Sequence, residues 1–173
     1  AIVNDSRDGL LRVRDIISDL SSFSRKQELE TGEFNVRKLV EETLRILNYE
    51  LKNKISVKVC VQEELTLNSH RGFLQQILTN LIKNSCQAIS STRSQKEMPE
   101  IEISNELNDE QFYLKVRDNG PGIAPANLNK IFDPFFTTKG VGKGTGLGLS
   151  VTYNLAKKMG GDLSVSSELN KYT

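Results

Sequence analysis

The sequence predicts an α/β fold with one mixed sheet and helices on one of its faces. Segments with the three- and four-residue spacing of an amphipathic helix alternate with segments whose apolar residues recur at every second position, as in half-buried strands. Two of the strand-like segments follow each other across a short polar turn, which indicates an antiparallel pair. With 173 residues, the chain is long enough for one ordinary domain and an appendage.

Residues 1–27 are predicted to form one helix with a heptad-like seam that is wide enough for a helical bundle. The seam consists of Val3, Ser6, Leu10, Val13, Ile17, Leu20 and Ser24, widened by Ile2, Ile16 and Phe23. One helix cannot bury this stripe, so we expect partners from a second copy of the chain and from upstream sequence; packing on its own domain is the alternative. The polar stretch 25–32 is typical of a linker, and it divides the chain into a unit of residues 1–29 and a unit of residues 30–173.

The second unit begins with a predicted helix over Val36–Leu51, whose leucines and valines follow the helical period. Residues 55–61 carry Ile or Val at every odd position, which predicts a strand. The remaining expected elements are a helix at Gly72–Ile89, strands at Ile101–Leu107 and Phe112–Val116 joined by a turn at Asn108, Asp109 and Glu110, a helix at Gly146–Met159, and a last strand at Leu163–Ser167. Between them, the Gly-, Pro- and Asn-rich residues 121–143 form a loop whose length is typical of a functional loop.

Charge and cysteine content exclude several classes of function. The chain has 23 Lys and Arg against 22 Asp and Glu, so nothing indicates binding to nucleic acid or to an anionic membrane. No stretch approaches the ~18 apolar residues of a membrane span, although the unusual first residue, Ala1, suggests a fragment and leaves open a membrane-anchored parent. Cys60 and Cys86 both lie in apolar stretches, so both are predicted to be buried in a protein of the reducing cytoplasm.

The helix expected at Gly72–Ile89 has two faces of different character. The buried stripe comprises Leu74, Ile77, Leu78, Leu81, Ser85 and Ala88, and the polar face comprises Gln76, Asn80, Lys83, Asn84 and Gln87. A solvated face is the simpler interpretation, but two asparagines one turn apart favour a function because Asn is a mediocre helix former. Amide oxygens are hard ligands that suit Mg²⁺.

Asp118 ends an apolar strand and opens the segment Asp-Asn-Gly-Pro-Gly. All five residues are common in turns, so a plain turn is one interpretation. The other is a carboxylate in the floor of a pocket, where it accepts a hydrogen bond from a ligand amine. Gly120 and Gly122 would then let the backbone approach a flat ring closely.

Residues 132–139 place three aromatic side chains in an eight-residue loop segment. Because exposed aromatic side chains are costly, we expect all three to dock and anchor the loop. Thr137, Thr138, Lys139 and Lys143 would stay polar and mobile, as in a hinged lid with a basic tip that suits a phosphate chain. The alternative is a loop that plugs the core.

Glycines alternate at positions 142, 144, 146 and 148 and lead directly into a helix. Such a turn presents free N–H groups and the positive end of the helix dipole to phosphate. The spacing matches neither the dinucleotide fingerprint nor the Walker loop. His70, the only histidine, is interpreted as structural because it lies far from the heptad helix and has no adjacent acidic residue.

Read together, the four segments resemble, in order and at typical separations, the N, G1, F and G2 boxes of sensor histidine kinases, and the form Phe-Phe-Thr-Thr-Lys is most similar to the nitrogen-regulation type. The segments are residues 80–84, 118–122, 132–139 and 144–149. The resemblance implies a two-layer α/β sandwich of the Bergerat type that binds ATP and Mg²⁺, with the loop between the G1 and G2 boxes as the ATP lid. It implies that Asp118 binds the adenine amine, that Asn84 coordinates Mg²⁺, and that residues 140–148 cradle the phosphates. The nucleotide site it implies comprises Asn80, Lys83, Asn84, Gln87, Asp118, Gly120, Gly122, Ile123, Phe135, Thr138, Lys139, Gly142, Lys143, Gly144, Thr145, Gly146, Leu147 and Gly148.

The resemblance also implies partners. Residues 1–27 are similar to the end of the second helix of the dimerisation and phosphotransfer domain, which implies a homodimer in the full-length protein, a response regulator receiver domain as partner, and a cytoplasmic location. The phosphoacceptor histidine of the family lies on the preceding helix, and His70 is not its equivalent.

Two further departures from the pattern of the family concern residue 87 and residues 170–173. Gln87 stands where a basic residue is common, so we expect a phosphate contact to move to Lys83. Asn170 to Thr173 replace the usual Gly-x-Gly-Thr hairpin and stop before the final strand. Asn170 tolerates a left-handed turn, but Tyr172 in place of Gly would be strained, and a missing strand would leave a sheet edge open.

Two other functions stay open at this point. A related ATPase of the same superfamily would need a catalytic Glu one turn before the metal-binding Asn, and that position is Asn80, which cannot act as a base. A non-catalytic, nucleotide-gated dimeric regulatory module would keep the same motifs without phosphoryl transfer.

Overall fold

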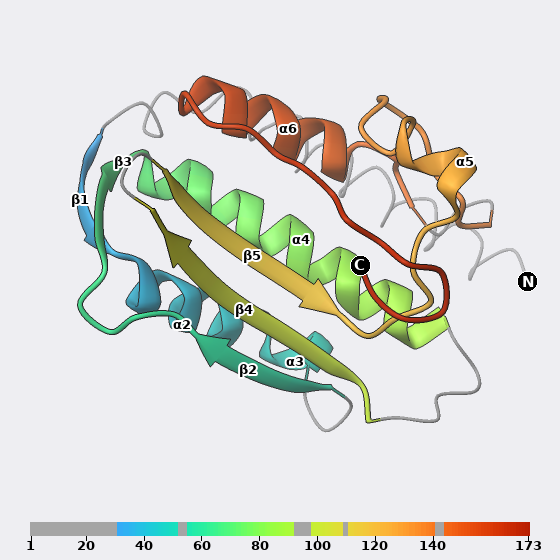
Figure 1. The fold of residues 1–173 in the computed structure, drawn as a ribbon, viewed down its shortest axis with the longest axis horizontal. Coiled ribbons are helices and arrows are strands. Elements are labelled where there is room, and N and C mark those ends of the chain that lie inside the picture. The colour runs from blue at the N-terminus through green and yellow to red at the C-terminus, as the bar shows by residue number, and fades with distance from the viewer. Residues whose placement is uncertain (1–30, 52–54, 92–97, 109–110, 141–143) are drawn as a thin grey trace, which may run out of the picture.

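In the computed structural model, helices cover one face of a mixed three-stranded sheet (Figure 1). The structure describes residues 31–51, 55–91, 98–108, 111–140 and 144–173. Strand β4 (Glu100–Leu107) is central; it pairs in parallel with β2 (Ser56–Cys60) and antiparallel with β5 (Phe112–Asp118). The α/β class and the mixed sheet are thus confirmed, as are three of the four expected strands, those at residues 55–61, 101–107 and 112–116.

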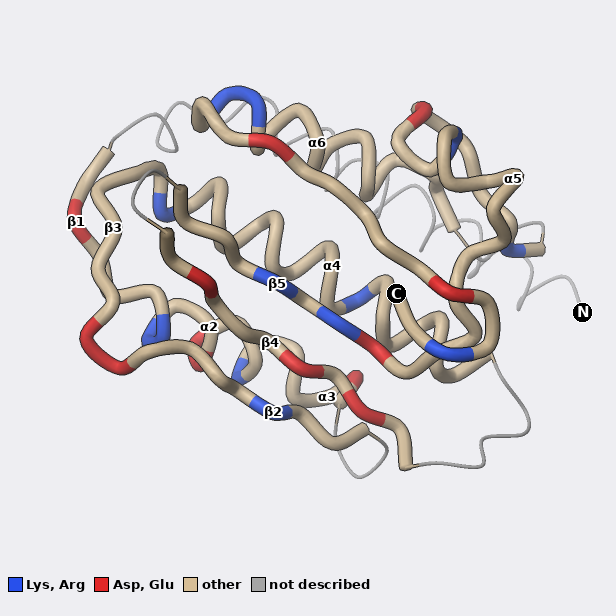
Figure 2. The backbone as a smooth tube through the Cα atoms, viewed as in Figure 1, with Lys and Arg blue, Asp and Glu red and all other residues tan. Residues whose placement is uncertain are grey.

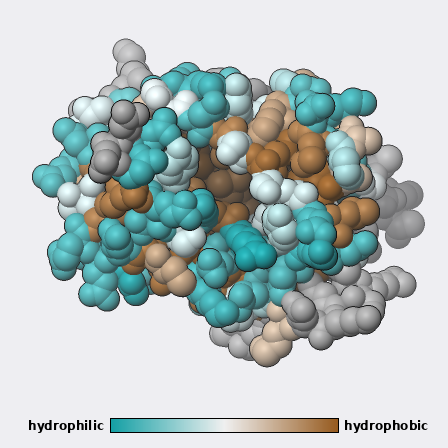
Figure 3. Space-filling model, in the orientation of Figure 1, coloured by the Kyte–Doolittle hydropathy of each residue, from teal (hydrophilic) through white to brown (hydrophobic). Residues whose placement is uncertain are grey.

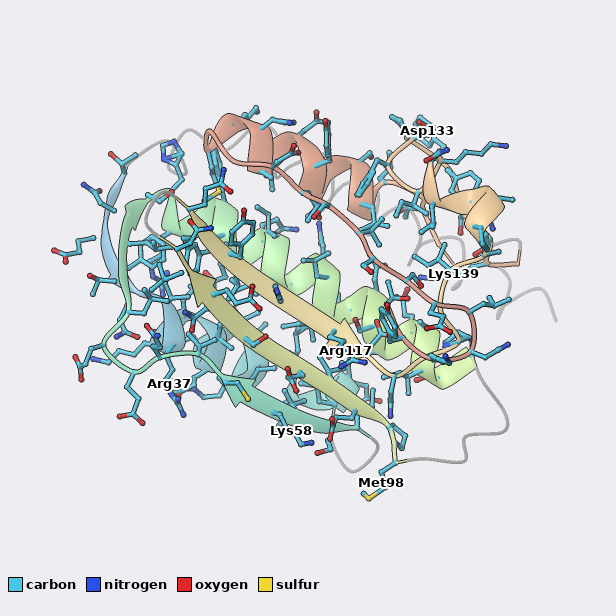
Figure 4. All side chains as sticks on the ribbon, in the orientation of Figure 1. Arg37, Lys58, Met98, Arg117, Asp133 and Lys139 are labelled. Carbon is cyan, nitrogen blue, oxygen red and sulfur yellow. The ribbon has the colours of Figure 1, made fainter. Side chains whose placement is uncertain are left out.

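The two faces of the sheet differ because side chains alternate along each strand. Ile101 and Ile103 of β4 are fully buried against the helices. On the opposite face, Lys58, Glu102 and Arg117 occupy paired positions on adjacent strands, where basic and acidic residues alternate (Figures 2 and 4). This face carries charges that compensate one another, and the core lies wholly on the helical side.

Three helices form the second layer: α2 (Val36–Ile46), α4 (Arg71–Ser91) and α6 (Gly148–Lys158). Helix α4 packs between the sheet, α2 and α6. The buried face of α4 differs in part from the prediction. Asn80 and Ile82, which were not among the predicted buried residues, are buried, whereas Leu81 and Ala88, which were, are only half-buried.

Several predicted boundaries were wrong. The expected helix at Val36–Leu51 breaks at Leu47, where the N–H donates back to Thr43, and a short helix α3 (Asn48–Leu51) follows. The sequence did not indicate the two-stranded antiparallel sheet of β1 (Gly32–Asn35) and β3 (Thr66–Ser69), nor the single turn of α5 (Pro125–Leu128). Each of these is only four residues long, too short for a periodic signal.

The prediction of a last strand at Leu163–Ser167 was wrong: burial alternates along this segment, but it pairs with no described strand and therefore forms none. Figure 3 shows an apolar hollow between β5 and this segment. The chain then turns at Asn170, whose φ of 62° confirms the left-handed prediction, and Thr173 exchanges backbone hydrogen bonds of 2.8 and 3.1 Å with Asp118. Apart from this pair of hydrogen bonds, no described strand pairs with the outer edge of β5.

The prediction of strain at Tyr172 was wrong, because φ is not positive there and the ring lies over the guanidinium of Arg117 at 4.8 Å. The prediction for the cysteines was half right. Cys86 is buried, whereas Cys60 is exposed because it falls on the outward side of β2.

Some predictions lie outside the described residues: the helix and linker of residues 1–30, Asp109 and Glu110 of the hairpin turn, and Gly142 and Lys143 of the glycine-rich segment. Among the described helices, none has the length and hydropathy needed to cross a membrane.

Candidate functional site

Asp118, the last residue of β5, is 5% exposed and anchors the site. Its Oδ2 accepts a hydrogen bond of 2.8 Å from the Ser85 hydroxyl on α4, and its Oδ1 accepts one of 3.0 Å from the Gly120 N–H. Burial raises the pKa of this carboxyl, and these two hydrogen bonds, which favour the ionised form, oppose the shift. The sheet and α4 therefore hold one desolvated acceptor in a fixed orientation.

The glycines after Asp118 are required for different reasons. A Cβ on Gly120 would lie 2.7 Å from Oδ1 of Asp118, so a side chain there would displace the carboxylate. Gly122 has a φ of 69°, and a Cβ there would lie 2.4 Å from the carbonyl oxygen of Glu168. The close backbone approach at Gly122 is thus made by the C-terminal turn, and the next N–H, of Ile123, donates to the Ser167 hydroxyl at 2.8 Å.

The two asparagines of α4 both lie against the first residue of α6. The Nδ2 of Asn80 donates to the Gly148 carbonyl at 3.3 Å and to the Thr152 hydroxyl at 3.2 Å. The Nδ2 of Asn84 lies 3.9 Å from the point that a Cβ on Gly148 would occupy. Asn80 is therefore buried between helices, whereas Lys83 is exposed.

The aromatic residues of the loop divide into docked and exposed. The ring of Phe132 packs on Tyr153 of α6 with 5.4 Å between centroids, and Phe136 is half-buried, as the anchoring prediction requires. The prediction was wrong for Phe135, which is 73% exposed. The backbone of Phe135 has a φ of 67°, and its N–H donates a hydrogen bond of 3.0 Å to the Gly146 carbonyl, while the side chain points outward.

The basic end of the loop folds back on α4. The Nζ of Lys139 donates to Oε1 of Gln87, and burial lowers the pKa of this amine. Gln87, at the position where a basic residue is common, thus accepts a hydrogen bond from a lysine of the loop. Thr138 is exposed, and a Cβ on Gly144 would lie 3.2 Å from the Thr137 hydroxyl.

The glycine-rich segment ends in the N-terminus of α6, as predicted. Thr145 accepts a hydrogen bond of 3.2 Å from the N–H of Leu147, whose side chain is buried between α4 and α6. The first turn of α6 contains no acidic residue. The N–H groups at a helix start and the positive end of the helix dipole suit an anion.

The residues present fit a magnesium ion that arrives with a phosphate chain. Within the described ranges, no three His, Cys, Asp or Glu side chains cluster as a protein-built metal site would require. Asn84 places an amide near the first residue of α6, and Mg²⁺ is commonly held by one or two protein oxygens together with substrate phosphates.

A buried carboxylate at a strand end and a glycine-rich helix start beside an amide-bearing helix define a nucleotide-binding α/β domain. Residues 69–173, more than half of the chain, match the family described as histidine kinase-, DNA gyrase B-, and HSP90-like ATPase, and the chain belongs to this family. The Bergerat-type sandwich predicted from the motifs is consistent with this membership.

Individual relatives support the same assignment. The two-component sensor PprA of Pseudomonas aeruginosa is 35% identical over 167 residues, which cover 92% of this chain and 18% of PprA. Sporulation kinase A of Bacillus subtilis is 31% identical over 167 residues, covering 95% of this chain and 26% of that protein. The chain therefore spans only about a fifth to a quarter of the length of these relatives.

Solved structures show the same fold. The catalytic domain of histidine kinase ThkA superposes with a TM-score of 0.71 at 29% identity, covering 83% of this chain and 91% of that one. ThkA in complex with the response regulator protein TrrA superposes with a TM-score of 0.74 at 25% identity, covering 96% and 46%. The resemblance to sensor histidine kinases is confirmed, and the nitrogen-regulation type stays a prediction.

Proposed function

We propose that this chain is the ATP-binding catalytic part of a protein-histidine kinase of a two-component system. It would bind Mg·ATP and transfer the γ-phosphoryl group to a histidine outside these 173 residues. The observation that carries the proposal is the position of the Asn84 side chain, whose Nδ2 lies 3.9 Å from the point that a Cβ on Gly148 would occupy. This position supports a role in which the amide oxygen of Asn84 ligates a metal and the start of α6 binds an anion. The buried carboxylate of Asp118 supplies the specific acceptor for the base.

Each part of the site would have one task. Asp118 accepts a hydrogen bond from the adenine amine, and Gly120 keeps the space beside it open. Residues 144–148 and Lys139 bind the phosphates, and Asn84 holds Mg²⁺, which supplies neutralisation of the phosphate charge. Catalysis would then consist chiefly of positioning and electrostatic stabilisation.

The position of His70 supports an acceptor from elsewhere. His70 immediately precedes α4, and Asn84 lies fourteen residues further along, about 21 Å at the rise of an α-helix. Its ring lies edge-on to Phe73 at 5.0 Å, and its Nδ1 is buried. A histidine held there is too far from Asn84 to receive the phosphoryl group.

Asn80 supports a kinase over an ATPase that activates water. An amide cannot accept the proton of an attacking water. The Nδ2 group of Asn80 already donates hydrogen bonds to the Gly148 carbonyl and to the Thr152 hydroxyl. We therefore expect negligible steady-state hydrolysis of ATP.

Three wider features belong to the same proposal. Residues 1–29 would form the end of the dimerisation domain and residues 30–173 the catalytic domain, giving a homodimer in the full-length, cytoplasmic kinase region. A response regulator receiver domain would be the partner that accepts the phosphoryl group next. The complex of ThkA with TrrA supports this last expectation.

The decisive experiment supplies the acceptor in trans. The purified chain is incubated with radiolabelled Mg·ATP and the dimerisation and phosphotransfer domain of the full-length protein, with a His70→Gln variant as matched control. We expect acid-labile label on the added domain and none on the chain, from both proteins. Label on His70, or rapid hydrolysis without acceptor, would contradict the proposal; binding without transfer would favour the non-catalytic regulatory module.

A further inference from the structure

Three groups form a closed polar triangle between α4 and α6. The Nδ2 of Asn80 lies 3.3 Å from the Gly148 carbonyl oxygen and 3.2 Å from the Thr152 hydroxyl, and that hydroxyl donates to the same carbonyl at 2.8 Å. The Nε2 of Gln76 donates to Oδ1 of Asn80 at 3.2 Å, which fixes the orientation of the amide. Asn80 is 8% exposed and Thr152 is fully buried.

The rest of this interface is apolar. The buried residues that hold the two helices together are Phe73, Ile77, Leu147, Val151, Leu155 and Ala156. Apolar contacts of this kind tolerate small shifts of one helix along the other, because they are not directional. A buried hydrogen-bonded group is directional, and leaving it unpaired is costly, so it selects one register of the two helices.

The triangle holds the first residue of α6, where the proposed function places the phosphate chain. Gly148 is the first residue of α6, and the amide of Asn84, one turn after Asn80, faces it from α4. Any shift of Gly148 relative to α4 would change the separation between Asn84 and the N–H groups of the first turn of α6. A metal ion bound to both the amide and a phosphate tolerates little such change.

We propose that Asn80 is a positioning residue which, through Thr152 and the Gly148 carbonyl, sets the start of α6 against Asn84 for binding of metal-bound triphosphate. This inference rests on the proposed binding of Mg·ATP, and it departs from the expectation that Asn80 touches the nucleotide. It assigns a role to Thr152, a buried residue outside the glycine-rich segment.

The test compares Asn80→Ala, Thr152→Val, the double variant and the conservative control Thr152→Ser. Affinity for Mg·ATP is measured by calorimetry, affinity for adenosine by NMR titration, and stability by thermal unfolding. We expect Asn80→Ala and Thr152→Val each to weaken Mg·ATP by roughly 5–10-fold, the effect of one lost hydrogen bond. The double variant should bind Mg·ATP no more weakly than either single variant, because each single substitution already breaks the same hydrogen-bonded triangle. Adenosine affinity should stay unchanged, and Thr152→Ser should stay within about twofold of the parent, because it keeps the hydroxyl.

Two outcomes would overturn the inference. Loss of Mg·ATP affinity in Asn80→Ala but not in Thr152→Val would mean that Asn80 contacts the ligand directly. Equal loss of affinity for both ligands, in step with lower thermal stability, would mean that the triangle serves folding alone. Failure of the parent chain to bind Mg·ATP at all would instead refute the proposed function, so the two failures are distinguishable.

Discussion

Phe135 and Gly146 face each other backbone to backbone where the loop meets the turn before α6. The N–H of Phe135 donates to the Gly146 carbonyl at 3.0 Å, and both residues have positive φ, of 67° and 68°. A Cβ on Gly146 would lie 2.4 Å from the carbonyl carbon of Phe135, so only glycine fits. This contact joins the aromatic loop to the glycine-rich segment, the two parts expected to enclose the phosphates.

Replacing Gly146 should therefore damage both stability and ligand binding. Gly146→Ala places a methyl group against the Phe135 backbone and forces alanine into the left-handed region, which should lower the free energy of unfolding by about 2 kcal/mol. Mg·ATP affinity should fall as well. Gly140→Ala is the matched control for stability, because a Cβ there meets no atom of the described residues within 4 Å. Urea denaturation would contradict this account if the two variants unfolded at the same midpoint.

The two phenylalanines of the loop should respond differently to truncation. Phe132→Ala removes the packing on Tyr153 and should cost about 1–3 kcal/mol, less than for a fully buried ring because Phe132 is half-buried. Phe135→Ala removes a side chain that is 73% exposed and should change stability by less than about 0.5 kcal/mol. Thermal unfolding of both variants checks this, and equal losses would show that Phe135 also anchors the loop.

Local periodicity predicted much of this fold. The sequence predicted strands β2 and β4 and helix α4, because burial alternates at every second residue in the strands and follows the helical period in α4. The four-residue strands β1 and β3 were not, because two side chains per face make no pattern. Leu47 continues the apolar stripe of α2 although the helix ends there, so hydrophobicity alone could not mark the boundary.

The site was predictable in its parts but not in its contacts. The motifs pointed to Asp118, Asn84 and the glycine-rich helix start, because the four segments that contain them have the order and the spacing of the boxes of sensor histidine kinases. Helical period placed Asn80 on a polar face, and only the packing of α6 buries it. Thr152 carried no signal in the sequence, since a threonine on a helix is ordinary unless its buried partner is known.

The two thiols should differ sharply in reactivity. Cys86 is buried, and desolvation raises the pKa of its thiol to about 11, so almost no thiolate forms near pH 8. Cys60 is exposed at the end of β2. Brief treatment of the folded protein with iodoacetamide at pH 8 should add one label per chain, at Cys60. Mass spectrometry of the digested protein reads the site, and rapid labelling of Cys86 would contradict its burial.

The charge of Lys139 should set the alkaline limit of ATP binding. Burial lowers the pKa of this amine from its ordinary value of 10.5, so the positive charge is lost at a lower pH than for an exposed lysine. As the pH is raised, Mg·ATP affinity should accordingly begin to fall before pH 10.5 is reached. Lys139→Arg stays charged throughout this range and should remove the alkaline decline. Calorimetric titrations from pH 7 to pH 10 test this, and parallel profiles for the two proteins would show that another group is responsible.

Asp118→Asn should separate stability from binding. Because burial raises the pKa of the Asp118 carboxyl above its ordinary 3.8, the ionised form is less favourable in the folded chain than in the unfolded one. The contribution of this group to stability is therefore greatest at acid pH, falls as pH rises from 3.8 through the raised pKa, and stays low at neutral pH. Asparagine carries no charge, so the variant should be at least as stable as the parent at pH 7, with a difference in stability that narrows towards acid pH.

The affinity of the Asp118→Asn variant for ATP should nevertheless drop by more than about tenfold, because a charged acceptor is replaced by a neutral one. Unfolding at several pH values and calorimetry at pH 7 measure the two effects. A variant that is clearly less stable at pH 7 would show that the hydrogen bonds from Ser85 and Gly120 outweigh desolvation, and unchanged ATP affinity would remove Asp118 from the nucleotide site.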